Sequence, residues 1–388
     1  MKKLNTLVKK VQEDLQQSNV DGWFVADFHG HNPIAQKFLS KKIFLSRRWA
    51  IWIPKNGEPV MVVNAIESKS LSSIGIPVLT YRNFEEWCSV LKQCVSNKHI
   101  YVEWFENGAI PYLSYLDGGL VDLLKSIGCK LESSGNISQR NLLLWSGKTI
   151  SAHIEAANSL TSIVLGVFER VSKTKPFEVD ESIVQGWLLE GFEKEGMVMD
   201  HPPVVAVNEH AGDPHYATPE KGGGKLGKDF ILLVDLWGTK TAVGPAYADI
   251  TWMAKRGKIE PIVDRGFYTV LEARDAGVRA IEKAFQKEET ILGYEVDQAV
   301  RSVIEDAGFG DGFIHRTGHN LGLTSAHGDA AQLDSYEAKD VRALIPGWAG
   351  TIEPGVYYPE WGIRSEINLV LNPHPIVTTR QQKDWFLV

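Results

Sequence analysis

Four carboxylates and one histidine in the second half of the chain have the side-chain types that bind divalent metals. They are Asp235, Asp249, His319, Glu353 and Glu366, and each lies in a stretch whose composition predicts a β-strand. Buried carboxylates repel one another and lose hydration, which is costly unless a cation compensates. Several oxygen donors with one imidazole nitrogen suit one or two divalent ions. If the five side chains converge, the sequence predicts a metal-dependent hydrolase.

Two of these carboxylates have ordinary alternatives. Asp235 follows a run of apolar strand residues, where an aspartate is more often a strand-end cap than a ligand, and Asp249 has the same ambiguity. Glu353 is more informative because it precedes Pro354. Proline donates no ladder hydrogen bond and keeps the preceding residue extended, so the carboxylate lies before a rigid kink.

The remaining two candidates are also ambiguous when taken alone. Glu366 lies two positions after Arg364, so the two share one face of a strand, and a structural ion pair is the alternative. His319 is flanked by Gly318 and Gly322, which allow other groups to approach closely. A single histidine is usually an ordinary polar residue, so His319 gains its meaning from the four carboxylates.

The elements that carry these residues occur twice in the same order. Apolar spacing predicts helices near 150–171 and 181–194, followed by strands at 203–207, 230–236 and 248–254. The order recurs with helices at 267–285 and 296–308, followed by strands at 312–316, 350–353 and 366–371. Each half ends in two strands that carry one carboxylate each, 249 − 235 = 14 and 366 − 353 = 13 positions apart. Two halves related by a pseudo-twofold axis would bring four carboxylates together, although such units also recur by coincidence.

The first 133 residues alternate short strands and helices and predict a separate α/β domain. Strands are expected from Asp21 and at 49–54, 59–63 and 100–104, and a helix at 120–128. The polar stretch after Ser133 is the best candidate for a linker.

Composition limits the function classes. The 388 residues carry a formal net charge of -7, and no basic stripe stands out, which argues against nucleic acid as a partner. The N-terminus predicts an amphipathic helix rather than a signal peptide, and no apolar run is long enough for a membrane span. Three cysteines without a C-x-x-C pair favour reduced thiols and a cytoplasmic location.

Three strings of residues resemble one known family. They are His315-Arg-Thr-Gly-His-Asn-Leu-Gly-Leu, Pro346-Gly-Trp-Ala-Gly-Thr-Ile-Glu-Pro-Gly-Val-Tyr and Gly362-Ile-Arg-Ser-Glu. Together they resemble the pita-bread metallopeptidases, the family of prolidase, aminopeptidase P, methionine aminopeptidase and the metal-free creatinase. The resemblance implies an α/β (α+β) fold: a creatinase-like N-terminal domain at 1–133, a linker at 134–147, and a pita-bread catalytic domain at 148–388. That domain would have duplicated helices and a curved antiparallel sheet.

The resemblance also implies a role for each candidate by position. Two divalent ions, manganese or else cobalt, iron or zinc, would be held by Asp235, Asp249, His319, Glu353 and Glu366. Glu353 would also act as the general base toward a metal-bound water. His215 and His327 resemble the two family histidines that face the substrate. Arg364 would buffer the negative charge of the cluster and fix Glu366.

The chain departs from the usual family pattern at four places. The connection between the two aspartates, through Gly238 to Pro245, is about three residues longer than usual. Trp252, Gly328 and Ile367 replace an arginine, a glutamate and an acidic residue of the pattern. These departures leave the five ligands in place but put the substrate specificity in question.

The resemblance implies hydrolysis of the Xaa-Pro bond of dipeptides or short peptides, by a homodimer. One alternative is a creatinase-fold hydrolase or lyase that acts on a small molecule other than a peptide. Another is a binding protein built on an inactive peptidase scaffold, for which lost ligands would be the signature. Metal content and Xaa-Pro cleavage discriminate among the three.

Overall fold

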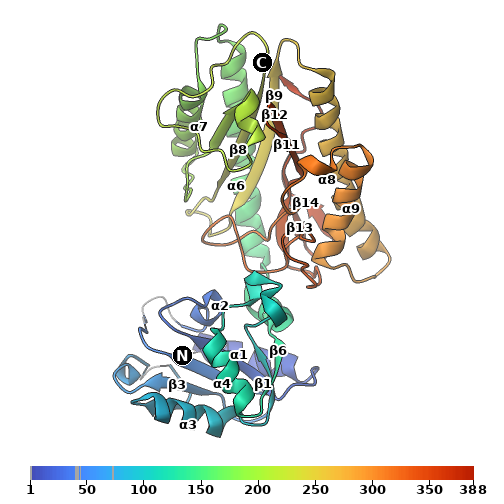
Figure 1. Cartoon of the computed structure of the whole chain (residues 1–388). Helices are drawn as coiled ribbons and strands as arrows, with labels where there is room; N and C mark the ends of the chain where they lie inside the picture. Colours follow the sequence, from blue (N-terminus) through green and yellow to red (C-terminus); the bar gives the residue numbers. More distant parts are fainter. Residues whose placement is uncertain (1, 40–42, 44, 72–73) are drawn as a thin grey trace. The chain divides into compact units, whose positions relative to one another are not determined.

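The computed structural model describes residues 2–39, 43, 45–71 and 74–388. The chain forms two compact units, Met1–Leu143 and Leu144–Val388, each with its own helices and sheets (Figure 1). The stretch at 134–147 contains two short helices, α5 (Gly135–Ser138) and η4 (Gln139–Leu143), within the first unit.

A six-stranded mixed sheet forms the first unit, in the order β4-β3-β2-β1-β5-β6. Its strands are β1 (Gly22–Asp27), β2 (Trp49–Pro54), β3 (Val60–Asn64), β4 (Val78–Tyr81), β5 (His99–Val102) and β6 (Lys130–Ser133). The pairs β1–β2 and β2–β3 are antiparallel, whereas β1–β5, β3–β4 and β5–β6 are parallel. The four strands expected in this part of the sequence are confirmed, within two residues at their ends.

Helices cover both faces of this sheet because a strand points successive side chains to opposite sides. Trp23 and Val25 pack in one core, which also contains residues of α1 (Lys2–Leu15) and α2 (Pro33–Gln36). Phe24 and Ala26 pack in the opposite core, with residues of α3 (Phe84–Val95) and α4 (Gly118–Ser126). The expected N-terminal amphipathic helix and the helix near 120–128 are therefore confirmed.

The second unit repeats one order of elements. Two long helices of 26 residues each, α6 (Gly147–Ser172) and α8 (Pro261–Gln286), are each followed by a shorter helix, α7 (Glu181–Glu195) or α9 (Gly293–Asp306). Strands follow each pair, and Figure 1 shows α6 and α7 beside β8 and β9, and α8 and α9 on the other side of the unit. The duplicated order expected from the sequence is confirmed.

The strands of the second unit form three small sheets. They are β15-β9-β8-β7, β10-β13-β14 and β11-β12. Their bounds are β7 (Val204–Val207), β8 (Phe230–Gly238), β9 (Ala248–Arg256), β10 (Ala349–Ile352), β11 (Gly355–Tyr358), β12 (Trp361–Arg364), β13 (Ile367–Leu371), β14 (Pro375–Val377) and β15 (Phe386–Leu387). The first two sheets meet where β9 and β13 lie side by side, and the Glu366 amide donates to the Thr251 carbonyl at 3.2 Å.

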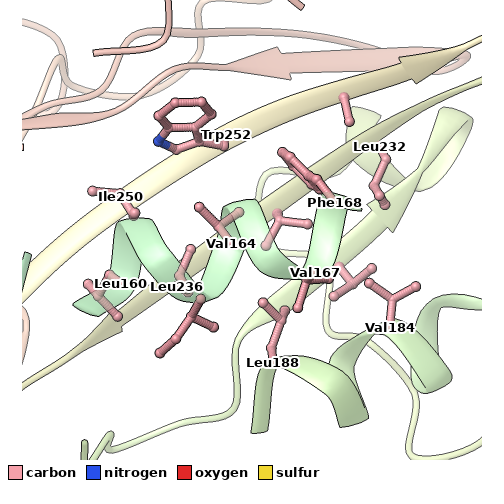
Figure 2. Close-up of a cluster of buried hydrophobic side chains, with 14 of the residues drawn as sticks. Leu160, Val164, Val167, Phe168, Val184, Leu188, Leu232, Leu236, Ile250 and Trp252 are labelled. Atoms are coloured by element: carbon pink, nitrogen blue, oxygen red, sulfur yellow. The ribbon is translucent and has the colours of Figure 1, made fainter. Parts of the chain in front are cut away.

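Apolar side chains of α6 hold the helix layer against the first of these sheets. Leu160, Val164 and Phe168 of α6 lie between β8 and β9 on one side and Val184 and Leu188 of α7 on the other (Figure 2). The helix α7 begins where Asp180 caps the Ile183 amide, and it ends at Gly196 in the left-handed conformation. The core therefore fixes β8 and β9, the strands that carry the first two carboxylates.

Two expectations about strands were wrong. Residues 312–316 do not form a strand, because the 3₁₀ turn η6 (Gly310–Gly312) is followed by irregular chain. Only Asp235 and Asp249 lie within strands; Glu353 directly follows β10 and Glu366 directly precedes β13. The chain at His319 lies beside β10, but the His319 amide donates to the Thr351 hydroxyl at 2.9 Å instead of to a backbone carbonyl. The ladder of backbone hydrogen bonds between this segment and β10 is therefore incomplete.

Candidate metal centre

Acidic and imidazole side chains converge where β9 meets β13. Asp249, His319 and Glu366 each present a ligand atom, and these atoms lie within 4.8 Å of one another. His319 Nε2 is 3.6 Å from Asp249 Oδ2 and 3.5 Å from Glu353 Oε1. Four residues from four separate segments thus face a common point, and three of them are buried.

The His319 ring presents an unprotonated nitrogen to the carboxylates. Its Nδ1 lies 3.0 Å from the Asn320 carbonyl, which can only accept, so Nδ1 carries the proton. Nε2 then points its lone pair at the acidic groups, the tautomer of a metal ligand whose second nitrogen is fixed by a backbone carbonyl. Burial lowers the pKa of His319, which favours the neutral ring.

Two buried carboxylate oxygens in this cluster have no hydrogen-bond partner within the described ranges, Asp249 Oδ1 and Glu366 Oε1. Burial, together with the charges of the neighbouring carboxylates, raises the pKa of Asp249 and of Glu366 well above the ordinary range. Unpaired buried carboxylates are strongly destabilising, whereas a dication would satisfy both oxygens at once. The donor set of three carboxylates and one imidazole therefore fits a hard or borderline divalent metal.

Asp235 is bound differently. Its Oδ2 accepts from Arg364 Nη2 at 2.5 Å, and its Oδ1 lies 3.1 Å from the Thr251 hydroxyl. The same hydroxyl lies 3.0 Å from Glu366 Oε2 and accepts from Arg364 Nε at 3.0 Å. Thr251 therefore links both carboxylates to one guanidinium.

The spacing of Arg364 and Glu366 suggested a direct ion pair, but no hydrogen bond or ion pair joins their side chains within the described part of the chain. The strand β12 ends at Arg364 and β13 begins at Ile367, so the two residues lie on either side of a strand break. Arg364 reaches across to Asp235 on β8 instead. Its contact with Glu366 runs through Thr251.

A polar chain behind Arg364 extends the site and was missed by the sequence analysis. Arg364 Nη1 donates to the Tyr357 hydroxyl at 3.0 Å, and that hydroxyl lies 2.9 Å from His315 Nε2. Because His315 Nδ1 faces the Arg316 carbonyl at 2.6 Å, it carries the proton, and Tyr357 must donate to Nε2. Two features of the sequence could have pointed to this chain: Tyr357 lies four residues after Glu353, and Thr251 lies two residues after Asp249.

The two histidines expected to face a substrate differ in position. His327 is exposed at the edge of the cluster, with its ring centroid 4.1 Å from that of His319, and the charge of this neighbouring imidazole lowers its pKa. His215 is exposed in the segment after η5 (Asn208–Gly212), and its backbone amide donates to Asp213 at 2.9 Å. Among the contacts of the described residues, none joins the His215 ring to the five candidate ligands.

The departures from the family pattern have separate structural settings. Trp252 is buried in the apolar cluster formed with α6, α7 and β8 (Figure 2), and because it lies an odd number of positions from Asp249 along β9 it points to the opposite face of the strand. A Cβ atom at Gly328 would lie 2.2 Å from Asn320 Oδ1, so this position has no room for a longer side chain without rearrangement. Ile367 is buried in β13 opposite Ile352. The connection between β8 and β9 spans residues 239–247.

Residues 152–373, more than half of the chain, match metallopeptidase family M24, and the chain belongs to this family. Its fold is the pita-bread fold expected from the sequence. No helix in the described part of the chain is both long and apolar enough to span a membrane.

Individual relatives include peptidases. The chain is 32% identical over 166 residues to a probable dipeptidase PepE of Mycobacterium tuberculosis, a match that covers 42% of this chain and 40% of that protein. The crystal structure of dipeptidase PepE from Mycobacterium ulcerans superposes with a TM-score of 0.71 at 22% identity, covering 99% of this chain and 98% of that one. An Xaa-Pro dipeptidase from Bacillus anthracis gives a TM-score of 0.64 at 20% identity, covering 99% of this chain and all of that one. At these identities the superpositions establish the fold.

Proposed function

We propose that the chain is a metal-dependent exopeptidase that hydrolyses the Xaa-Pro bond of dipeptides or short peptides. The observation that carries the proposal is the convergence of Asp249, His319, Glu353 and Glu366, with two buried oxygens left unpartnered. Membership of metallopeptidase family M24 supports a peptide as substrate. The name of the Bacillus anthracis relative supports proline at the second position.

Five side chains would hold two divalent ions, with manganese as the first choice. They are Asp235, Asp249, His319, Glu353 and Glu366. When bound, the ions supply a nucleophilic water and polarise the substrate carbonyl. Burial raises the pKa of Asp235, and the ion pair with Arg364 opposes this shift and orients the carboxylate, because guanidinium remains charged at any relevant pH.

Glu353 would take the proton of the attacking water. Burial raises its pKa, whereas the basic groups His319, His315 and Arg364 lower it, and the net shift is downward. The carboxylate is therefore ionised at neutral pH and able to accept a proton. The Thr351 hydroxyl occupies Oε1 at 2.9 Å, which leaves Oε2 as the oxygen that receives the proton.

Three further side chains would act on the substrate or on the ligands. His327, next to His319, would donate to the oxygen that gains charge during attack. His215 would reach the substrate from the exposed segment after η5, a role that the sequence resemblance supports. Arg364, backed by Tyr357 and His315, would hold the position of Asp235. The homodimer and the cytoplasmic location stay predictions.

The test combines metal analysis with peptide cleavage. Purified protein would be analysed for bound metal and then assayed with Ala-Pro, Ala-Pro-Ala and Ala-Ala, with Mn²⁺ and with EDTA, beside Asp249→Asn as the matched control. Metal-dependent cleavage of Ala-Pro or Ala-Pro-Ala, but not Ala-Ala, is expected. Bound metal without cleavage of any Xaa-Pro peptide would favour the hydrolase or lyase acting on another small molecule. Absence of bound metal under every condition would favour a binding protein.

A further inference from the structure

An aspartate outside the ligand set lies at the edge of the metal-binding face. Val198 pairs with Thr239 through two backbone hydrogen bonds of 2.9 Å, which places residues 198–200 beside the end of β8. Asp200 then accepts a hydrogen bond from Trp237 Nε1 at 2.5 Å. Asp200 is exposed, so its carboxylate is open to a ligand from solvent.

The sheet register puts Trp237 on the same face as the candidate ligands. Trp237 lies two positions after Asp235, and in the antiparallel pair β8–β9 it is directly opposite Asp249. Residues two apart along a strand, and residues opposite each other across strands, share a face. The Trp237 side chain therefore leaves the sheet on the same face as the Asp249 carboxylate, and its Nε1 binds Asp200.

The charge of Asp200 lacks a cationic partner. Among the ion pairs of residues 2–39, 43, 45–71 and 74–388, none includes Asp200, and its one side-chain hydrogen bond comes from the neutral indole. The negative charge of Asp200 also acts on the Asp249 carboxylate, so the two groups repel each other. A bound cation would relieve that repulsion and could also lie against the indole ring.

We propose that Asp200, oriented by Trp237, is a specificity-determining residue for a cationic group on the N-terminal residue of the substrate. The proposal rests on the exopeptidase function proposed above, because an exopeptidase places the N-terminal residue beside the metal-binding face. The shared chemistry is an ammonium or guanidinium, from either the α-amino group or a basic side chain. Because Asp200 is bound to the Trp237 indole, the methylenes of a lysine or arginine side chain could pack on the ring while the charged end reaches the carboxylate, which favours a basic side chain as the source.

Binding without turnover tests the proposal independently of catalysis. Calorimetry would measure L-lysine, Nα-acetyl-L-lysine and L-norleucine against Mn²⁺-loaded wild type, Asp200→Asn and the control Glu282→Gln, which removes an exposed charge on α8. We expect Asp200→Asn to weaken both lysine compounds by about tenfold and to leave norleucine unchanged, as for one lost charge-assisted hydrogen bond. If Asp200→Asn instead weakens the binding of L-lysine and L-norleucine but not that of Nα-acetyl-L-lysine, the cationic group bound by Asp200 is the α-amino group.

Two further results decide the proposal. Equal affinity of wild type and Asp200→Asn for all three compounds, or no binding of any of them to wild type, would overturn it. Trp237→Phe keeps the ring but removes the donor, and it should reproduce part of the Asp200→Asn effect. If wild type binds lysine through Asp200 yet cleaves no Xaa-Pro peptide, the cation site stands and the proposed peptidase function fails. With active enzyme, Asp200→Asn should lower kcat/KM for Lys-Pro about tenfold more than for Ala-Pro.

Discussion

The Asn368 side chain joins the two halves of the second unit by binding the backbone of Asp249 on both sides. Its Oδ1 accepts from the Asp249 amide at 3.0 Å, and its Nδ2 donates to the Asp249 carbonyl at 2.6 Å. Asn368 is fully buried in β13, and Asp249 belongs to β9. A side-chain amide thus takes the place of backbone hydrogen bonds between β9 and β13 at this point. It fixes the position of Asp249 along β9 relative to Glu366, which directly precedes β13.

Replacing this amide should weaken both the fold and the metal centre. Asn368→Ala leaves the buried amide and carbonyl of Asp249 without partners, and each such group costs about 1–3 kcal/mol. We expect the free energy of unfolding to fall by about 2–6 kcal/mol and the affinity for Mn²⁺ to fall with it. Urea denaturation and metal titration would measure the two effects. The exposed Asn372→Ala is the control, and an equal, small loss in both variants would contradict the role of Asn368.

Sequence periodicity predicted α1, α4 and the four helices of the second unit, together with most strands, because apolar spacing is local. It did not predict α3 or the strands β4, β6, β11, β12, β14 and β15. The five candidate ligands were also visible, since charged groups in apolar strands are conspicuous. Thr251, Asn368 and Tyr357 were not, because a neutral polar residue in a buried strand is informative only once its neighbour across the sheet is known.

The errors have the same origin. The Arg364–Glu366 pair was inferred from a continuous strand, but the strand breaks between these residues. His319 was placed in a strand because its neighbours are compatible with one. Its real position depends on the Thr351 hydroxyl, which is 32 residues away in sequence.

Asp249→Asn should separate folding from metal binding. The substitution removes one of the buried, unpartnered carboxylates, so the metal-free protein loses a source of repulsion. We expect activity below detection, Mn²⁺ affinity reduced by more than about 100-fold, and an unfolding free energy of the metal-free protein higher by about 1 kcal/mol. Metal titration and urea denaturation in EDTA would measure these quantities. Near-normal turnover in this variant would mean that Asp249 is not a ligand.

Asp249 and Glu366 should each contribute stability to the metal-free protein that is lost as the pH rises. Burial and neighbouring charges raise the pKa of Asp249 and of Glu366 in the folded state, so folded protein holds protons that the unfolded chain releases above pH ~4. The stabilisation is complete below that pH and is lost as the pH rises through the raised pKa values. The loss should be about 1.4 kcal/mol per pH unit for each proton held.

Urea denaturation in EDTA between pH 5 and pH 8 would measure the slope in wild type and in Asp249→Asn. Histidines with lowered pKa values, His153, His315, His319 and His327, add a slope of opposite sign below pH ~6.5, so the difference between the two proteins isolates Asp249. Asp249→Asn should reduce the slope, because the variant has one fewer proton to lose. Saturating Mn²⁺ should remove or reverse it, since a bound dication favours the ionised carboxylates. Equal slopes in wild type and Asp249→Asn would contradict the raised pKa of Asp249.

Glu353→Gln should remove the general base while leaving its surroundings intact. Glutamine has the same shape, and its Oε1 can still accept from the Thr351 hydroxyl, so the end of β10 should keep its structure. We expect kcat to fall by about 10²–10⁴ with little change in unfolding free energy, because the amide cannot take a proton from water. The control is Glu360→Gln, which removes the same charge at an exposed turn between β11 and β12. Steady-state kinetics on Ala-Pro and measured Mn²⁺ occupancy would distinguish loss of the base from loss of metal; a fully occupied variant with unreduced kcat would assign the base to another residue.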